Sequence, residues 1–325
     1  MNKDRNNIRT IQFNEIDGIK VGNHTDSQAG TGVTVFYFPQ TATGAVTILG
    51  GGPASRESEL ANPERNLQKL NALVLAGGSS YGLEAAHGVM KFLEQQKIGY
   101  DTGAAVVPLV CQSDIYDLSY GSSDVRPDKE AGYQACKEAF LSNRPISGNI
   151  GAGTGATVGK PYGTARAQKG GMGYYAVQLG ELQVGVAVVA NSFGDIYYKG
   201  GKIAGMTDRN RKSFADAAAA LYEMQPSNLF TGNTTIAAVF TNGDFNAIEL
   251  KKIANMASAG FARAIRPVFT MADGDTIYAF STGSQKVKSD INIAGVLAAD
   301  VIEEALYDAI TASRISDDEY LRHIL

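Results

Sequence analysis

Short apolar runs rich in Val, Ile, Phe, Tyr and Thr recur along this chain of 325 residues, and such runs are typical of β-strands. They predict strands at 34–38, 45–49, 72–76, 105–110, 235–241 and 276–281. A longer apolar stretch over 170–189 is divided by Gly180 and Glu181, which predicts a β-hairpin with its turn at that point.

Between these runs, apolar residues recur every three or four positions, as they do on one face of a helix. This spacing predicts helices at 83–93, 128–141, 214–224, 247–264 and 293–311. Strands and helices mixed along the whole chain favour an α/β protein built in layers over a helical bundle or a β-sandwich.

Glycine clusters and turn residues separate these elements. The 37 glycines lie mostly in short groups, which indicates tight turns and close backbone approach. Residues 148–160 form a Gly-rich loop, and residues 225–228 predict a turn ahead of the strand at 235–241. No internal repeat or low-complexity linker is present, and the length suits one large domain or two ordinary ones.

Composition narrows the functional classes. Apolar residues make up 44% of the chain and charged residues 19%, as in soluble globular proteins. The net charge is −4 and the basic residues are scattered, so we expect no nucleic-acid partner. The first ten residues are polar and no apolar run is long enough to span a bilayer, so we expect a cytoplasmic protein without a membrane partner. In that compartment Cys111 and Cys136 are expected to be free thiols.

The sequence Thr-Gly-Asn-Thr-Thr-Ile at 231–236 lies directly before a predicted strand. A hydroxyl that follows a flexible Gly-Asn pair can attack its own preceding carbonyl, here between Asn233 and Thr234. Cleavage would give Thr234 a free α-amine with a pKa of about 7.7–8.0, which could act as general base for the Thr hydroxyl. The alternative is an ordinary Gly-Asn turn that enters a strand.

The Gly-rich loop ends in Gly159 and Lys160 and superficially resembles a P-loop. The P-loop pattern fails, because Thr154 lies where its first Gly should be and Pro161 lies where Ser or Thr should bind magnesium. We interpret the loop as one that carries Lys160 into a site, where its charge could stabilise an anion or shift the pKa of a neighbour. A solvated Lys beside a turn is the alternative.

Three further positions could carry chemistry. Asn191 follows an apolar strand and could donate to an oxyanion, or could be a turn residue. Asp273 and Asp275 flank one Gly before a strand and could orient a hydroxyl or an ammonium, or form an Asp-Gly turn. Tyr81 precedes the first long helix and could help to hold an anion, or could simply pack at the helix start. The three histidines are far apart in sequence, so we expect no metal site and no cofactor.

Together these motifs resemble the self-cleaving amidase family of L-aminopeptidase/D-amino-acid esterase–amidases, β-peptidyl aminopeptidases and endo-type 6-aminohexanoate-oligomer (nylon-oligomer) hydrolases. The similarity extends from Gly30 onward over nearly the whole chain. Its most specific segments are 76–85, 151–160, 188–191, 232–236 and 273–276. Their order and spacing look most like the nylon-oligomer hydrolases, which have a Thr nucleophile and an Asp-Gly-Asp pair.

The resemblance implies a role for each matching residue. Thr234 would be the nucleophile for self-cleavage and for substrate, with Asp273 and Asp275 polarising its hydroxyl and amine. Asn191 would contribute to the oxyanion hole. Lys160 and Tyr81 would line the site and assist charge stabilisation.

The resemblance also implies the fold and the assembly. The fold would be a four-layer αββα sandwich, with two β-sheets between helical layers. A single domain over 1–325 would be cut into residues 1–233 and 234–325, which would stay associated and form a homo-oligomer, often a homotetramer. The implied activity is hydrolysis of linear amides or peptides, with nylon oligomers among the candidate substrates.

Several alternatives remain open at this point. The activity could be that of an aminopeptidase or β-peptidase of the same family, or of an acyltransferase similar to ornithine acetyltransferase. A binding protein on the same fold that never cleaves is a further alternative. An aminopeptidase would need an acid to hold the substrate amine, and Asp117, Asp128 and Glu130 are candidates.

Overall fold

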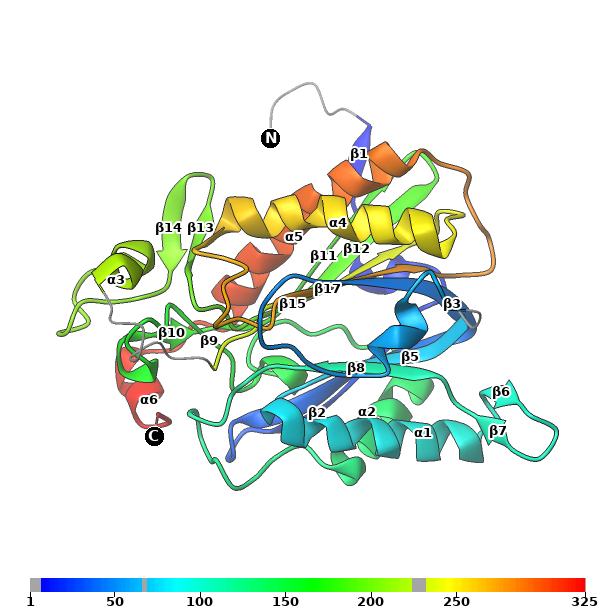
Figure 1. Cartoon of the computed structure of the whole chain (residues 1–325), viewed down its shortest axis with the longest axis horizontal. Coiled ribbons are helices and arrows are strands. Elements are labelled where there is room, and N and C mark those ends of the chain that lie inside the picture. Colours follow the sequence, from blue (N-terminus) through cyan, green and yellow to red (C-terminus); the bar gives the residue numbers. More distant parts are fainter. Residues whose placement is uncertain (1–6, 66–68, 224–231, 325) are drawn as a thin grey trace.

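The computed structural model of the chain describes residues 7–65, 69–223 and 232–324. Figure 1 shows four layers, with helices α4 and α5 on one side, helices α1 and α2 on the opposite side, and β-strands in two layers between them. The four-layer αββα sandwich expected from the sequence is therefore confirmed.

The first β-layer contains strands that lie far apart in the sequence. Its order is β1 (Ile8–Thr10), β11 (Gly171–Leu179), β12 (Leu182–Ala190), β15 (Ile236–Thr241) and β17 (Thr276–Ser281). β11 and β12 form the expected hairpin, with Leu179 opposite Leu182 at the turn. β15 and β17 are parallel, whereas β15 runs antiparallel to β12.

The second β-layer is joined to the first through one long strand, β3 (Thr31–Ile48). Residues 43–48 of β3 pair with β17, and residues 31–37 pair with β2 (Lys20–Asp26). β5 (Lys69–Ala76) pairs with residues 33–37 of β3 and, beyond a register break, with residues 42 and 43. β5 continues to β8 (Val110–Asp114) and β4 (Ala54–Arg56). The two short strands expected at 34–38 and 45–49 are thus one strand, whose register breaks between Tyr37 and Ala42.

Helices cover the outer face of each layer. α4 (Ala247–Ala264) and α5 (Ile291–Ala312) pack against the first layer through Leu250, Phe261, Val301 and Ile302. α1 (Ala85–Gln95) and α2 (Lys129–Leu141) pack against the second, with Asp128 as the N-cap of α2. Aromatic rings fill the space between the two layers, where the rings of Phe36 and Phe240, and of Phe38 and Phe280, lie 5.0 Å apart.

The strand expected at 105–110 is displaced. Val106–Val107 (β7) pairs with Tyr100–Asp101 (β6) in a small ribbon, and the buried strand β8 begins only at Val110. Pro108 lacks the N–H that a continuous ladder needs, which explains the break. β8 also carries buried polar residues, so an apolar pattern could not locate it.

The smaller elements lie beside these layers. They are β9 (Thr157–Val158), β10 (Gln168–Lys169), β13 (Asp195–Tyr198), β14 (Gly201–Ala204), β16 (Ile265–Arg266), α3 (Ala217–Glu223), α6 (Asp317–Leu321), and short 3₁₀ turns at Phe13–Glu15, Ser58–Ala61, Ser79–Glu84, Gly151–Gly153 and Thr164–Arg166. The turn expected at 225–228 lies outside the described residues. Over the three described ranges, no helix combines the length and apolarity needed to cross a membrane.

Candidate active site

Three chain segments meet at the edge of the first β-layer where Thr234 lies. Because β12 is antiparallel to β15 and β15 is parallel to β17, the end of β12 and the starts of β15 and β17 share this edge. Asn191 follows β12, and the Thr234 N–H donates to its carbonyl oxygen at 3.0 Å. Asn233 pairs with Asp273 just before β17. The fold thus brings together residues that are distant in sequence, of which Asn191 and Asp275 are 84 positions apart.

The Thr234 side chain lies against the peptide group that precedes it. Its hydroxyl donates to the carbonyl oxygen of Asn233. The backbone N–H of Gly274 donates to the same oxygen at 3.0 Å. Asn233 and Thr234 are both buried, so bulk water does not compete for these groups. A hydroxyl held against its own preceding carbonyl has the proximity that attack on that carbonyl requires.

The two aspartates accept hydrogen bonds from backbone groups near Thr234. Asp275 accepts from the N–H of Thr235 at 2.7 Å and from the N–H of Phe269 at 3.0 Å. Asp273 accepts from the N–H of Phe193 at 3.1 Å and from the Thr270 hydroxyl at 2.5 Å.

Burial raises the pKa of both carboxyls. For Asp275, burial and the negative charge of Asp273 together raise the pKa to about 8. For Asp273 the pKa is also raised, chiefly by burial, although the bond from Thr270 and the charge of Lys160 oppose the shift. Backbone bonds hold both carboxylates beside Thr234 despite this desolvation.

Lys160 points into the protein beside the same peptide. Its ammonium donates to the Asn191 side-chain oxygen at 2.8 Å, to the Asn191 carbonyl at 3.1 Å and to the Gly232 carbonyl at 3.3 Å. Burial lowers its pKa to about 7, against the opposing charges of Asp273, Asp117 and Asp275. The preceding Gly159 has a φ of +78°, and a Cβ there would lie 2.0 Å from the Met206 nitrogen, so glycine is what allows the loop to turn inward.

Both polar atoms of the Asn191 side chain have hydrogen-bond partners. Its oxygen also accepts from the N–H of Thr157 at 3.0 Å, and its amide nitrogen donates to the Tyr116 carbonyl at 3.1 Å. In this arrangement Asn191 fixes the position of Lys160, and the Asn233 carbonyl accepts from the N–H of Gly274 as well as from the Thr234 hydroxyl.

Tyr81 is placed differently from the other expected site residues. Its ring is 57% exposed and lies against the guanidinium of Arg126, 3.9 Å from the ring centroid. Within the described residues, no hydrogen bond or ring contact joins Tyr81 to Thr234 or Lys160.

The three acids considered for gripping a substrate amine are already occupied. Asp117 is buried and accepts from the Thr31 hydroxyl at 2.7 Å and from the Gly78 N–H at 2.6 Å. Asp128 caps α2, and Glu130 accepts from the Gln134 side chain on the surface of the same helix.

Sequence reasoning missed the backbone donors. The N–H groups of Gly274 and Phe193 donate to the Asn233 carbonyl and to Asp273, yet a backbone N–H is present at every non-Pro residue and gives no signal in a sequence. Thr270 could have been found, because a Thr three residues before an Asp often bonds to it locally.

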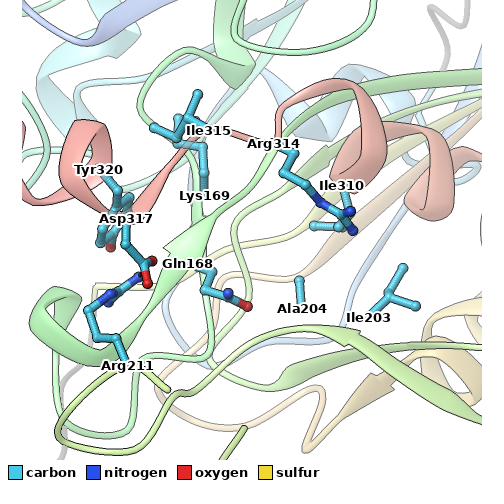
Figure 2. Close-up of a pocket in the computed structure, with 10 residues that line it drawn as sticks. All are labelled: Gln168, Lys169, Ile203, Ala204, Arg211, Ile310, Arg314, Ile315, Asp317 and Tyr320. Atoms are coloured by element: carbon cyan, nitrogen blue, oxygen red, sulfur yellow. Dashed lines mark hydrogen bonds and ion pairs between the residues drawn. The ribbon is translucent and has the colours of Figure 1, made fainter. Parts of the chain in front are cut away.

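The described residues also include a small cavity of about 50 Å³ at the C-terminal end of α5 (Figure 2). Its lining includes Lys169, Arg211, Arg314 and Asp317, and Arg211 pairs with Asp317 at 2.7 Å. Thr234 does not line it, so this cavity is separate from the edge where Thr234 lies. Over the described ranges, no group of three or more His, Cys, Asp or Glu residues is placed to hold a metal ion.

Comparison with known proteins assigns this chain to a family. The model of peptidase family S58 matches residues 12–319. An uncharacterised aminopeptidase of Mycobacterium leprae is 34% identical, covering 92% of this chain and 90% of the relative. A 6-aminohexanoate-oligomer endohydrolase of a Kocuria species is 33% identical, covering 92% and 86%. Because the two identities are nearly equal, they do not show whether this chain is more similar to the aminopeptidases or to the endohydrolases.

A solved structure shares the fold. The L-aminopeptidase D-Ala-esterase/amidase of Ochrobactrum anthropi, described as a variant of the Ntn hydrolase fold, superposes with a TM-score of 0.66 at 18% identity, over 95% of this chain and 91% of that one. The four-layer arrangement of this chain is therefore the fold of that protein.

Proposed function

The chain belongs to peptidase family S58 and is an amide hydrolase, and we propose that it makes its own nucleophile by cutting the bond between Asn233 and Thr234. The observation that carries this proposal is the Thr234 hydroxyl lying against the carbonyl of Asn233. The products would be residues 1–233 and 234–325. β15 lies between β12 and β17 inside a sheet, so the second piece would remain bound to the first.

The self-cleavage proceeds as an acyl shift. The Thr234 Oγ forms a bond to the Asn233 carbonyl carbon, the bond from that carbon to the Thr234 nitrogen breaks, and the hydroxyl proton ends on the departing nitrogen. Water then hydrolyses the resulting ester, which releases the Asn233 carboxylate and restores the hydroxyl. Thr234 is left with a free α-amine, whose ordinary pKa of about 7.7–8.0 suits a general base near neutral pH.

Turnover of substrate repeats the same chemistry. Thr234 attacks the substrate amide, the amine product leaves, and water hydrolyses the acyl-enzyme with the α-amine as base. Asp275 and Asp273 hold the segments on either side of the nucleophile through the backbone bonds described above. Lys160 supplies positive charge beside the reacting carbonyl, and Asn191 positions Lys160 and contributes to the oxyanion hole. Tyr81 is assigned to the site through the family resemblance.

We propose a linear amide as substrate, with 6-aminohexanoate oligomers as the first candidates. An endo-type hydrolase needs no acid to grip a free amine, and Asp117, Asp128 and Glu130 are all engaged elsewhere. The relatives named as aminopeptidases make an aminopeptidase or β-peptidase activity the second candidate.

The test is to incubate purified protein with a 6-aminohexanoate oligomer, a β-amino acid amide, and an acetylated donor plus ornithine, with Thr234→Ala as control. Hydrolysis of the oligomer by the wild type alone supports the proposal. Release of the β-amino acid only would support the second candidate, and acetyl transfer to ornithine without hydrolysis would contradict both.

We further propose that the processed protein is a cytoplasmic homotetramer. Exposed apolar residues on the outer helices, Ile248 on α4 and Val296 on α5, are 72% and 54% exposed and offer surface for such an assembly. Light scattering of the processed protein gives the mass of the assembly directly. A monomer at micromolar concentration would contradict this part of the proposal.

A further inference from the structure

The carbonyl that Thr234 would attack already has a backbone donor. The N–H of Gly274 lies 3.0 Å from the Asn233 oxygen, through the parallel pairing of Asn233 with Asp273. During attack this oxygen gains negative charge, and a donor at that distance is in range to stabilise it. The donor needs no rearrangement, because the same hydrogen bond exists before the reaction.

The two polar side chains nearest to this peptide are directed to other acceptors. The Asn191 amide nitrogen donates to the Tyr116 carbonyl, and the Lys160 ammonium donates to both Asn191 oxygens and to the Gly232 carbonyl. Their described bonds do not reach the Asn233 oxygen. The Gly274 N–H, by contrast, donates directly to that oxygen.

The absence of a side chain at position 274 also has a steric reason. A Cβ there would lie 2.6 Å from the Thr234 Oγ, 2.7 Å from the Gly52 carbonyl oxygen and 3.1 Å from the Pro53 Cα. A residue with a side chain would displace the nucleophile or lose the N–H contact. Glycine lets one residue both donate to the carbonyl and leave room for the attacking oxygen.

We propose that the backbone N–H of Gly274 is the oxyanion donor for self-cleavage, and that glycine is required there because a Cβ would occupy the space of the Thr234 hydroxyl. This inference rests on the proposed cut between Asn233 and Thr234. It adds a catalytic group that lies between the two aspartates and contacts the reacting carbonyl directly.

The direct test replaces Gly274 by glycolic acid during cell-free translation, which exchanges the N–H for an ester oxygen and adds no side chain. We expect the rate of self-cleavage at neutral pH to fall about 100–1,000-fold, as for loss of one oxyanion donor. The matched control places glycolic acid at Gly180, an exposed turn residue with no atom near its Cβ position, where the rate should not change. Scission of the introduced ester would be recognised by its different fragment, which ends at residue 273.

A second pair of variants tests the steric requirement. Gly274→Ala should fold, as judged by circular dichroism, and remain uncut. Gly52→Ala is the control, because its Cβ would meet nothing closer than the Asp273 carbonyl oxygen at 3.8 Å, and it should be cut at the wild-type rate.

The outcomes separate this inference from the proposed function. If the wild type itself is never cut, the proposed self-cleavage fails. If the wild type is cut and the glycolic acid variant at 274 is cut equally fast, self-cleavage stands and the role of the Gly274 N–H is wrong.

Discussion

The two β-layers each contain a parallel strand pair with two buried carboxylates at one end, yet only one of these ends has the geometry of a reaction site. Asp273 and Asp275 precede β17, which is parallel to β15. In the other layer, Asp114 ends β8, which is parallel to β5, and Asp117 follows it. The second pair of carboxylates will be called the Asp114–Asp117 pair.

Burial raises the pKa of the carboxyls in both places. The pKa of Asp275 rises to about 8 and that of Asp117 to about 6, chiefly through loss of contact with water. Both regions also contain a Thr hydroxyl. At the Asp114–Asp117 pair, the Thr31 hydroxyl donates to the Asp117 carboxylate, whereas the Thr234 hydroxyl donates to a peptide carbonyl. Both regions therefore have a raised carboxyl pKa and a nearby hydroxyl, and they differ because only the Thr234 hydroxyl lies against its own preceding carbonyl.

The largest difference between the two regions should appear when the Thr234 hydroxyl is removed and the shape of the side chain is kept. Thr234→Val should leave a single uncut chain with no amidase activity, because nothing else there can form the acyl-enzyme. Gel electrophoresis and an amide hydrolysis assay measure both effects. Thr235→Val is the matched control, since it removes a neighbouring buried hydroxyl that has no hydrogen-bond partner among the described residues. An uncut Thr235→Val protein would contradict the assignment to Thr234.

The next largest effect is expected at Asn191. Asn191→Ala should lower kcat about 100–1,000-fold, as for loss of an oxyanion donor. The variant also frees Lys160 from its closest partner and leaves the Thr157 N–H unpaired. Circular dichroism must show that the variant is folded. Full amidase activity in a folded variant would show that Asn191 is not part of the oxyanion hole.

The two carboxylate pairs can be compared directly with equivalent amide substitutions. Asp275→Asn should slow self-cleavage about 100-fold, because the new NH₂ group opposes the N–H of Thr235 or Phe269 and shifts the start of β15. Asp117→Asn should slow the cut less than tenfold, since its partners Thr31 and Gly78 belong to the other layer. Time courses of cleavage measure both, and a larger loss for Asp117→Asn would reverse our assignment of the two regions.

The pH dependence of stability should reveal the Asp114–Asp117 pair. The folded pKa of Asp117, about 6, is above its unfolded value of about 3.9, so the folded state binds this proton more tightly. Its stabilising contribution is complete below pH 4 and is lost as the pH rises through 6. In the uncut Thr234→Val background, urea unfolding should show that Asp117→Asn removes a pH-dependent loss of about 2 kcal/mol between pH 4 and pH 7. Parallel pH profiles of the two proteins would contradict the raised pKa.

The smallest effect is expected at Thr235. Its buried hydroxyl lacks a partner among the described residues, so Thr235→Val should raise the free energy of unfolding by about 1–3 kcal/mol. Urea unfolding in the Thr234→Val background measures the change. A destabilised variant would contradict this prediction and would show that the Thr235 hydroxyl is hydrogen-bonded in the folded protein.

Local patterns predicted much of the fold and part of the site. Helix α4 and strand β17 have the expected bounds, and the hairpin lies within one residue of them, because their apolar patterns are unbroken. The continuity of β3 could not be predicted, because its register break places polar residues at its centre. β8 was also missed, because its buried polar residues are satisfied by tertiary contacts such as the bond between the hydroxyls of Ser113 and Tyr278.

The candidate site likewise has features that the sequence predicts and features that depend on tertiary structure. The sequence predicted Thr234, Asp273 and Asp275 as site residues, because their side chains carry recognisable chemistry, and the structure brings them together at one sheet edge. It could not point to Gly274, because the role that we propose for it depends on a backbone N–H and an absent Cβ. Neither could it show that Tyr81 is exposed against Arg126, since that depends on how the 3₁₀ turn Ser79–Glu84 packs.

Self-cleavage between Asn233 and Thr234 is tested most directly by the intact mass and N-terminal sequence of the purified protein, measured beside the Thr234→Val variant. We predict two associated fragments in the wild type, with the smaller one beginning Thr-Thr-Ile-Ala at Thr234, and one full-length chain in the variant. A wild-type chain that remains whole after prolonged incubation would contradict self-cleavage and would favour a binding protein on this fold.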